Sequence, residues 1–434
     1  MRIEASHALF LIAACVAACR AEAVPPEIAP AWPAAVAARK LTRADCVALA
    51  LRSAPNQAAW TARLALARAE LERAKRLPNP TLSLGWEDLG LNAAAQHGPV
   101  QTTLSLAVAL EDLVSRKGRT KVAKHALLAE EAELRAEMAR TASDVARAHD
   151  RLVAARGRVA LSRELAQVAE AQRAAARKLV AAGVLAAIEN RRAEAELAEA
   201  ETEVTASETE ARVLELELAF ALGFERPVAL ALAEGMTQAD RALSDLDALL
   251  ARAVAQRPEL QSAAEGYAAE LERLRLTAAR VTFLPTISGG PRTQGDELSA
   301  VASIDAVLPI FDSGALAKTT GEAELLAAAA RARQAAKSVA SEVCTALERQ
   351  HGAAEFLDAH ARERSARRRR LREDSERLFT AGEIDYGALV LARRDEVEAR
   401  RSELDAQLAL ALAQIDLDAA LGDTAAVAGS ALDP

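Results

Sequence analysis

The chain has 434 residues, of which 51% are hydrophobic but only 3% aromatic. Because Phe, Tyr and Trp normally supply the bulk of an enzyme core, this composition argues against one large compact core. The dominance of Ala, Leu, Glu and Arg favours long, closely packed helices instead. The net charge of −8 argues against nucleic-acid binding as the main role.

Residues 1–18 predict a signal peptide of the lipoprotein type. An apolar run from Ala8 to Ala18 follows a basic residue and is too short to cross a bilayer as a helix, as is typical of a secretory leader. The run ends in Val16-Ala17-Ala18-Cys19, which resembles a bacterial lipobox. We therefore expect lipidation of Cys19, with processing at Cys15 or cleavage before Val24 as the alternatives.

Residues 19–40 are expected to form an extended linker, because four prolines lie between Val24 and Ala35. No later segment contains eighteen consecutive apolar residues, the length that would predict a membrane-spanning helix. Any membrane crossing must therefore be made by strands.

The rest of the chain divides into two halves that share the same landmarks. Leu179-Val180-Ala181-Ala182-Gly183 is followed by Ala221-Leu222-Gly223, and Leu378-Phe379-Thr380-Ala381-Gly382 is followed by Ala420-Leu421-Gly422. The first and last glycines are forty residues apart in both halves. We expect a first repeat over residues 41–225, a linker over 226–242, a second repeat over 243–423 and a tail over 424–434.

Each repeat predicts a helix, two strands and a long helical hairpin. The first helix is expected from about Thr42 to Lys75, and its counterpart from about Ser244 to Arg280. Both are followed by a Leu-Pro pair, at which a helix stops because proline lacks the backbone donor. Alternating polar and apolar residues predict the strands. Their expected ranges are about 80–88 and 101–110 in the first repeat, and about 284–290 and 299–308 in the second.

In the strands of the first repeat, apolar and polar residues alternate as they do in the strands of a membrane-spanning β-barrel. Leu82, Leu84 and Trp86 would face lipid, whereas the small and polar residues between them would face a wet lumen. Four strands are too few to enclose a channel, but three protomers supply twelve. We therefore expect each protomer to contribute four strands to a trimeric 12-stranded β-barrel, with a soluble two-stranded cap on a coiled coil as the alternative.

Long helices are expected from about Lys117 to Ala182 and from about Ala315 to Ala381. Apolar residues recur there at a spacing of about 3.5 residues, which is typical of coiled-coil pairing. Turns at Gly183 and Gly382 reverse the chain into antiparallel partner helices, and we expect both glycines at positive φ. The predicted fold class is mainly α with a small β part, built from two repeats of long antiparallel coiled-coil hairpins.

The one dense basic run, Arg364 to Arg372, lies inside the second long helical pattern, among glutamates and aspartates. We interpret it as a solvated helix face. Cys46 and Cys344 are the only cysteines outside the leader, and a single widely separated pair is not a disulfide framework.

Several motifs make the chain resemble the outer-membrane efflux protein family, whose members are TolC-like, from Leu41 to Asp423. In order along the sequence they are Leu41–Ala50, Leu77–Ser83, Arg257–Leu260, Leu308–Gly314 and Ala381–Ile384. Each motif is weak alone, but their order and double occurrence make the resemblance specific. Within the family, the cation-efflux outer-membrane lipoprotein branch is the candidate.

The resemblance implies an outer-membrane channel that serves as the exit duct of a tripartite efflux system. It implies a homotrimer in outer-membrane lipid with a periplasmic helical domain. The implied partners are a periplasmic adaptor (membrane fusion) protein and an inner-membrane pump of the resistance-nodulation-division type.

The family's adaptor-docking and gating end corresponds to the two hairpin tips. The tip residues are Gly183, Val184, Leu185, Gly382, Glu383, Ile384 and Asp385. Glu383 and Asp385 would ring the closed tip and select cations. An ordinary solvated turn is the alternative for these two residues.

A lipid-anchored periplasmic coiled-coil scaffold without transport activity is the alternative function. It would keep the leader and the helices, but it has no need for strand pairs at the same place in each half. No nucleophile, phosphate loop or carboxylate pair predicts an enzyme, and no cofactor or metal site is expected. The exported substrate stays open between a metal cation, by branch resemblance, and a drug or other organic molecule.

Overall fold

The computed structural model describes residues 40–53, 56–87, 100–184, 186–224, 226–233, 235–236, 245–280, 285–306, 311 and 314–423. All of them belong to one compact unit, Arg39–Pro434. The predicted signal peptide, Cys19 and the C-terminal tail lie outside the described residues. The described part is mainly helical with a single four-stranded sheet, so the predicted fold class is confirmed.

The helix expected at the start of each repeat is in fact two helices. In the first repeat these are α2 (Arg43–Ser53) and α3 (Asn56–Lys75), and in the second α6 (Leu246–Gln256) and α7 (Pro258–Arg280). Proline explains the break, because its ring disfavours helical backbone in the residue before it. Arg257, directly before Pro258, is extended with φ −65° and ψ 118°. Pro258 then occupies the first helical position, where its missing N–H costs nothing.

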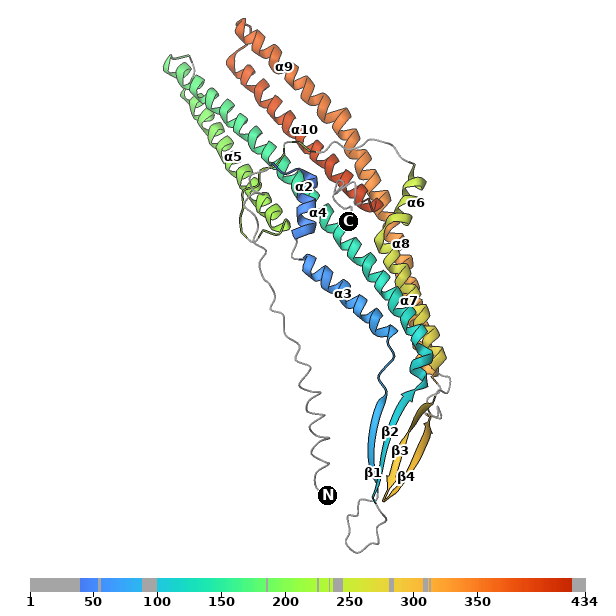
Figure 1. Cartoon of the computed structure of the whole chain (residues 1–434). Helices are drawn as coiled ribbons and strands as arrows, with labels where there is room; N and C mark the ends of the chain where they lie inside the picture. Colours follow the sequence, from blue (N-terminus) through green and yellow to red (C-terminus); the bar gives the residue numbers. More distant parts are fainter. Residues whose placement is uncertain are drawn as a thin grey trace, which may run out of the picture. The chain divides into compact units, whose positions relative to one another are not determined.

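The sheet is antiparallel and its strand order is the chain order. The strands are β1 (Thr81–Glu87), β2 (Gln101–Ala109), β3 (Thr286–Gln294) and β4 (Glu297–Asp305). Thr81 pairs with Ala107, Ala109 with Thr286, and Asp305 with Thr286 on its other side. β2 and β3, which come from different repeats, are therefore neighbours, and β1 and β4 form the two edges (Figure 1).

The strands of the second repeat differ from the expected 284–290 and 299–308. β3 runs on through the glycines and proline that predicted a loop, and the reversal is a tight turn at Gly295 and Asp296. Gly290 is needed inside the strand, because a Cβ there would lie 1.9 Å from the carbonyl oxygen of Leu104 on β2. Glycine in this strand therefore permits a close backbone approach, which the sequence pattern did not distinguish from a loop.

The long helices also differ from the expected ranges. α4 (Leu110–Ala181) begins directly after β2 and has 72 residues, which makes it about 110 Å long. α5 (Ala187–Ala221) is its antiparallel partner. The second long helix is interrupted: α8 (Ala315–Glu355) and α9 (Glu363–Thr380) are joined by the π-helical segment η2 (Phe356–Arg362), and α10 (Tyr386–Leu421) returns.

The position of the π-helical segment agrees with a one-residue change in the sequence offset between the two repeats. Leu127 and Leu325 differ by 198 positions, whereas Gly183 and Gly382 differ by 199. The second repeat thus contains one extra residue between these landmarks. A π-helical turn takes up an extra residue without breaking the helix, and η2 lies in that interval.

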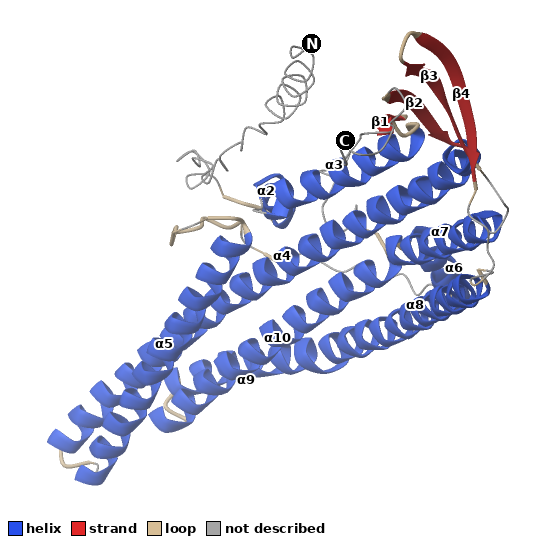
Figure 2. Ribbon diagram, turned by 90° about the horizontal axis from the view of Figure 1, so that it is seen from below, coloured by secondary structure: helices blue, strands red, loops and turns tan. Residues whose placement is uncertain are grey.

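The helices pack in a defined order across the protomer. α3 and α5 both pack on α4, α4 packs on α7 and α10, and these pack on α8 and α9 (Figure 2). Glycines let the long helices approach closely: a Cβ on Gly157 would lie 2.8 Å from Leu404, and one on Gly118 would lie 2.9 Å from Leu276. None of the helices in the described ranges has the length and apolar content that a bilayer crossing requires.

Candidate functional site

The first hairpin tip is a helix C-cap built around Gly183. The Gly183 N–H donates to Val180 O at 3.0 Å and the Val184 N–H donates to Leu179 O at 2.9 Å, which is the Schellman pattern. Gly183 has φ 72°, as predicted, and a Cβ there would meet nothing within 4 Å. Val184 is 68% exposed. Leu185, predicted at the same tip, lies outside the described residues.

The second tip has the same backbone arrangement. The Gly382 N–H donates to Phe379 O at 3.0 Å, the Glu383 N–H donates to Leu378 O at 2.9 Å, and Gly382 has φ 76°. Asp385 ends the turn as the N-cap of α10, where its Oδ1 accepts from the Ala388 N–H at 2.8 Å.

The remaining residues of the second tip differ in exposure. Ile384 is half-buried and Glu383 is exposed. The rings of Phe379 and Tyr386 meet edge to face across the turn, with centroids 5.8 Å apart. An aromatic pair therefore joins the two sides of the second tip.

Ion pairs between the two hairpins place their tips at the same height. Arg401 Nη1 lies 2.7 Å from Glu203 Oε1, and these residues are 19 and 20 positions from Gly382 and Gly183 (401 − 382 and 203 − 183). Arg400 Nη1 lies 2.8 Å from Glu164 Oε2, at 18 and 19 positions from the same glycines (400 − 382 and 183 − 164). The two tips therefore end level with each other.

Behind the second tip, α9 and α10 are joined by a cluster of four charged residues. Arg372 Nη1 and Arg393 Nη2 donate to Glu376 at 2.8 and 2.9 Å, and Arg372 Nε lies 2.7 Å from Glu396, which is 7% exposed. Although partial burial opposes ionisation, the hydrogen bonds from Arg393 and Arg372 hold the pKa of Glu376 below its usual value. The cluster was not predicted, because pairing across helices depends on a register that the sequence does not show.

The sheet has one apolar and one polar face, and both are open in the protomer. Residues that pair directly across antiparallel strands share a face. Leu82 pairs with Leu106, Val108 with Ile287, and Ile287 with Ile304. Exposed side chains on this face include Leu82, Leu84, Trp86, Leu104, Leu106, Val108, Ile287, Leu298 and Ile304.

The opposite face of the sheet carries polar contacts. Ser288 Oγ lies 2.6 Å from Ser303 Oγ, and Arg292 Nη2 donates to Glu87 Oε2 at 3.2 Å. Two faces of such different polarity, neither covered, are typical of a sheet that separates lipid from water. The alternation predicted for β1 therefore extends across all four strands.

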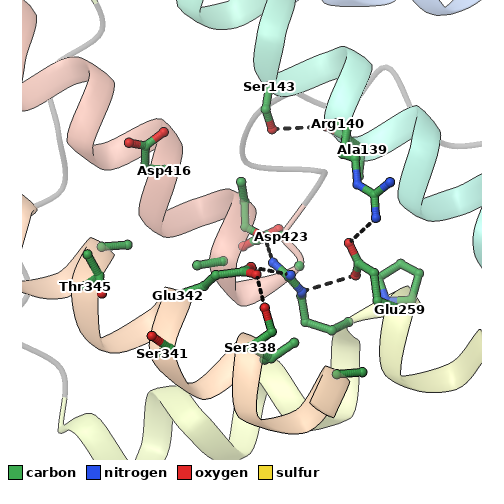
Figure 3. A pocket seen from close by; sticks show the side chains of 18 of the residues that line it. Ala139, Arg140, Ser143, Glu259, Ser338, Ser341, Glu342, Thr345, Asp416 and Asp423 are labelled. Carbon is green, nitrogen blue, oxygen red and sulfur yellow. Dashed lines mark hydrogen bonds and ion pairs between the residues drawn. The ribbon is translucent and has the colours of Figure 1, made fainter. Parts of the chain in front are cut away.

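A hollow of about 950 Å³ lies between α4, the α6–α7 junction, α8 and α10. Several of its charged side chains are paired with each other. Arg140 pairs with Glu259 at 3.4 Å (Figure 3), and Arg147 pairs with Asp416 at 2.8 Å. Arg257 donates to Ala419 O at 2.8 Å and to Glu342 at 2.5 Å. These contacts fasten the start of α7 to the end of α10, and we interpret the hollow as a structural junction.

The two cysteines in the described part of the chain do not form a disulfide. Cys46 and Cys344 are both free, Cys46 is fully buried, and burial followed by the Asp45 charge raises the pKa of Cys46 to about 12. Within the described ranges, no three His, Cys, Asp or Glu side chains gather as a set of metal ligands.

The fold has clear relatives among known proteins. Residues 47–224 match the family model described as Outer membrane efflux protein. The outer-membrane channel OprN superposes with a TM-score of 0.74 at 19% identity, covering 92% of this chain and 97% of that chain. CusC gives 0.73 at 17% identity, covering 91% and 95%. VceC of Vibrio cholerae gives 0.73 at 17% identity, covering 88% and 96%. No curated protein sequence matches the chain significantly.

At these identities the structural likeness establishes the fold, and the chain has the fold of TolC-like outer-membrane channels. Together with the match over residues 47–224, it confirms the resemblance to the outer-membrane efflux protein family. That family and these relatives are channels and not enzymes. The sequence match covers the first repeat alone, whereas the structural likeness spans both.

Proposed function

We propose that this protein is the outer-membrane channel of a tripartite efflux system, through which substrate passes from the periplasm or an inner-membrane pump to the exterior. Three copies would join β4 of one protomer to β1 of the next and close a 12-stranded barrel. Their helical hairpins would form a periplasmic duct beneath it.

The observation that carries this proposal is the two-faced sheet with two free edges. Leu298 and Ile304 on β4 are 74% and 71% exposed, and Leu82 on β1 is 66% exposed. Apolar side chains exposed over a whole sheet face would drive aggregation in water but are stable against lipid. Edge strands with unpaired backbone groups need partners, and a closed ring of copies provides them.

The hairpin tips support the proposed partners. We propose that Gly183, Val184 and Leu185 on one hairpin and Gly382 to Asp385 on the other form the end that meets a periplasmic adaptor and opens. A pump of the resistance-nodulation-division type would then deliver substrate through the adaptor. The two tips are level, so a partner can contact both in one plane. The substrate stays open between a metal cation, which the branch resemblance favours, and a drug or other organic molecule.

A matched pair of substitutions in β1 tests the barrel. Leu84→Arg places a charge on the apolar face and is expected to cost about 2–4 kcal/mol per protomer if that face meets lipid. Ser83→Arg places the same charge on the neighbouring position of the polar face and should be tolerated. The measurement is the amount of detergent-resistant trimer recovered from the outer membrane.

The lipid-anchored scaffold predicts a different result in the same experiment. It requires no trimer, so Leu84→Arg and Ser83→Arg would behave alike, and Cys19→Ser would release a monomer from the membrane. The channel predicts that the Cys19→Ser trimer stays in the membrane through its barrel. A released monomer would therefore exclude the proposed channel.

A further inference from the structure

The helices α5 and α9 are the two outer members of the tip half of the protomer. α5 packs mainly on α4, and α9 packs mainly on α10 and η2. Each of them therefore has one side that no helix of its own protomer covers. The basic run Arg364 to Arg372, interpreted from sequence as a solvated face, lies on α9.

The two outer helices carry opposite charge. α5 contains ten glutamates and three arginines, a balance of −7 (3 − 10). α9 contains seven arginines and four acidic residues, a balance of +3 (7 − 4), and the excess is concentrated in its first ten residues. Opposite charges on the two edges of one protomer favour a head-to-tail contact between identical copies.

The opposite charges also lie at the same height above the tips. At 1.5 Å per helical residue, Arg370 and Arg364 on α9 lie about 18 and 27 Å from Gly382. On α5, Glu199 and Glu201 lie about 24 and 27 Å from Gly183 by the same measure. The tips themselves are level, as the Arg400 and Arg401 ion pairs require. When α9 of one copy lies beside α5 of another copy, the arginines of α9 therefore lie beside the glutamates of α5.

Several of these charges have no partner within the protomer. Most arginines of α9 are paired, for example Arg368 with Asp395 at 2.5 Å and Arg367 with Glu363 at 2.5 Å. Among the described residues, the side chains of Arg364 and Arg370 on α9 make no ion pair. Among the described residues of α5, the exposed side chains of Glu199, Glu201 and Glu217 likewise make no ion pair.

Both helices also present apolar or small side chains between these charges. Leu371 and Leu378 on α9 are 46% and 39% exposed and lie seven residues apart, the spacing of a coiled-coil seam. On α5, Ile188 is 62% exposed, and Ala195 is exposed one heptad further along the helix. Leu371 and Ala195 lie about 17 and 18 Å from their tips, so they too are level.

We propose that α9 of one copy lies antiparallel to α5 of the next copy in an electrostatic seam. Arg364 and Arg370 pair there with Glu201 and Glu199, on either side of a Leu371–Ala195 contact. This assignment rests on the proposed trimer and adds the residues that close its tip half. Because the charges are open to solvent, the seam weakens as salt rises, whereas the apolar sheet face does not.

Disulfide cross-linking of the full-length protein tests the seam. Ala195→Cys and Leu371→Cys, in a Cys344→Ser background, should give covalent oligomers on oxidation, because the two positions meet only between copies. The control pair Phe220→Cys and Leu371→Cys should give none, since Phe220 lies about 56 Å from its tip.

Charge reversal supplies the second arm. Arg364→Glu with Arg370→Glu should lower the cross-linking yield about fivefold at low salt, and adding Glu199→Arg with Glu201→Arg should restore it. Adding Glu217→Arg instead should not restore it, because that residue lies about 51 Å from the tip. Raising the salt to about 1 M should lower the wild-type yield in the same way.

A mass measurement in detergent separates the two proposals. The seam would be refuted by a trimer that forms no cross-link between the Ala195 and Leu371 positions. It would also be refuted by a trimer whose cross-linking yield does not change on charge reversal or with salt. Neither result would contradict the proposed channel. A monomer would refute both. A trimer with cross-links that fall on reversal and return on the double reversal is the expected result.

Discussion

Four glycines that recur in the two halves end four helices in the same way. Gly183 and Gly223 have φ 72° and 89°, and Gly382 and Gly422 have φ 76° and 78°. In each case the N–H of the following residue donates to a carbonyl five positions back. The sequence predicted the caps at Gly183 and Gly382, because a left-handed residue after a helix favours glycine so strongly.

Gly183→Ala should lower the stability of the first hairpin by about 1–2 kcal/mol, because a Cβ is strained at positive φ. Gly352→Ala is the matched control, since Gly352 lies inside α8 without positive φ and also has nothing within 4 Å of an added Cβ. There alanine should be neutral or stabilising by about 0.5–1 kcal/mol. The urea midpoint of the helical circular-dichroism signal measures both, and equal shifts would contradict the assigned cap.

The two free thiols should differ sharply in reactivity. Alkylation requires the thiolate, and Cys46 is both fully buried and held neutral by a pKa of about 12. We expect iodoacetamide at pH 8 to modify Cys344 first and to modify Cys46 only after unfolding. Peptide mass spectrometry over time gives both rates, and early modification of Cys46 would contradict its burial in α2, which packs on α4.

At the scale of the elements, the sequence predicted which segments are helices and strands better than it predicted where each one begins and ends. Alternation found the strands of the first repeat because Leu82, Leu84 and Trp86 all lie on one face. It misplaced those of the second repeat, because the close approach of Gly290 to Leu104 is a tertiary contact. The sequence did not predict the helix break before Pro258, because apolar periodicity continues on both sides of it.

The charged cluster between α9 and α10 should make the second hairpin sensitive to acid. The folded-state pKa of Glu376 is lowered, so its stabilising contribution is complete above its unfolded value near 4 and is lost as pH falls through the folded value. Glu376→Gln should cost about 1 kcal/mol at neutral pH, since the group is partly open to solvent.

The difference between wild type and Glu376→Gln should shrink as the pH falls below 4, because protonation removes the same charge from the wild type. Glu348→Gln, at an exposed position of α8, is the control and should show no such dependence. Hydrogen exchange over α9 and α10 measures the effect. A penalty that stays constant with pH would mean that ionic pairing does not stabilise this hairpin.

At the scale of the whole molecule, the sequence was enough to predict the two repeats and the family resemblance. It was not enough to predict which charged side chains pair between helices. The forty-residue spacing of the glycines was visible in the chain, but Arg400 and Glu164 are 236 residues apart and meet only because the two tips are level. The ion-pair cluster between α9 and α10 depends in the same way on which helices are neighbours.

The π-helical segment η2 makes the two halves of the chain inequivalent. α4 passes the corresponding level as an unbroken helix, whereas α8 and α9 contain an additional residue there. In a ring of three copies, plain and interrupted long helices would therefore alternate, so the ring repeats every third of a turn and not every sixth. A ligand that recognises one hairpin type would accordingly find three equivalent positions, even though six hairpins surround the axis.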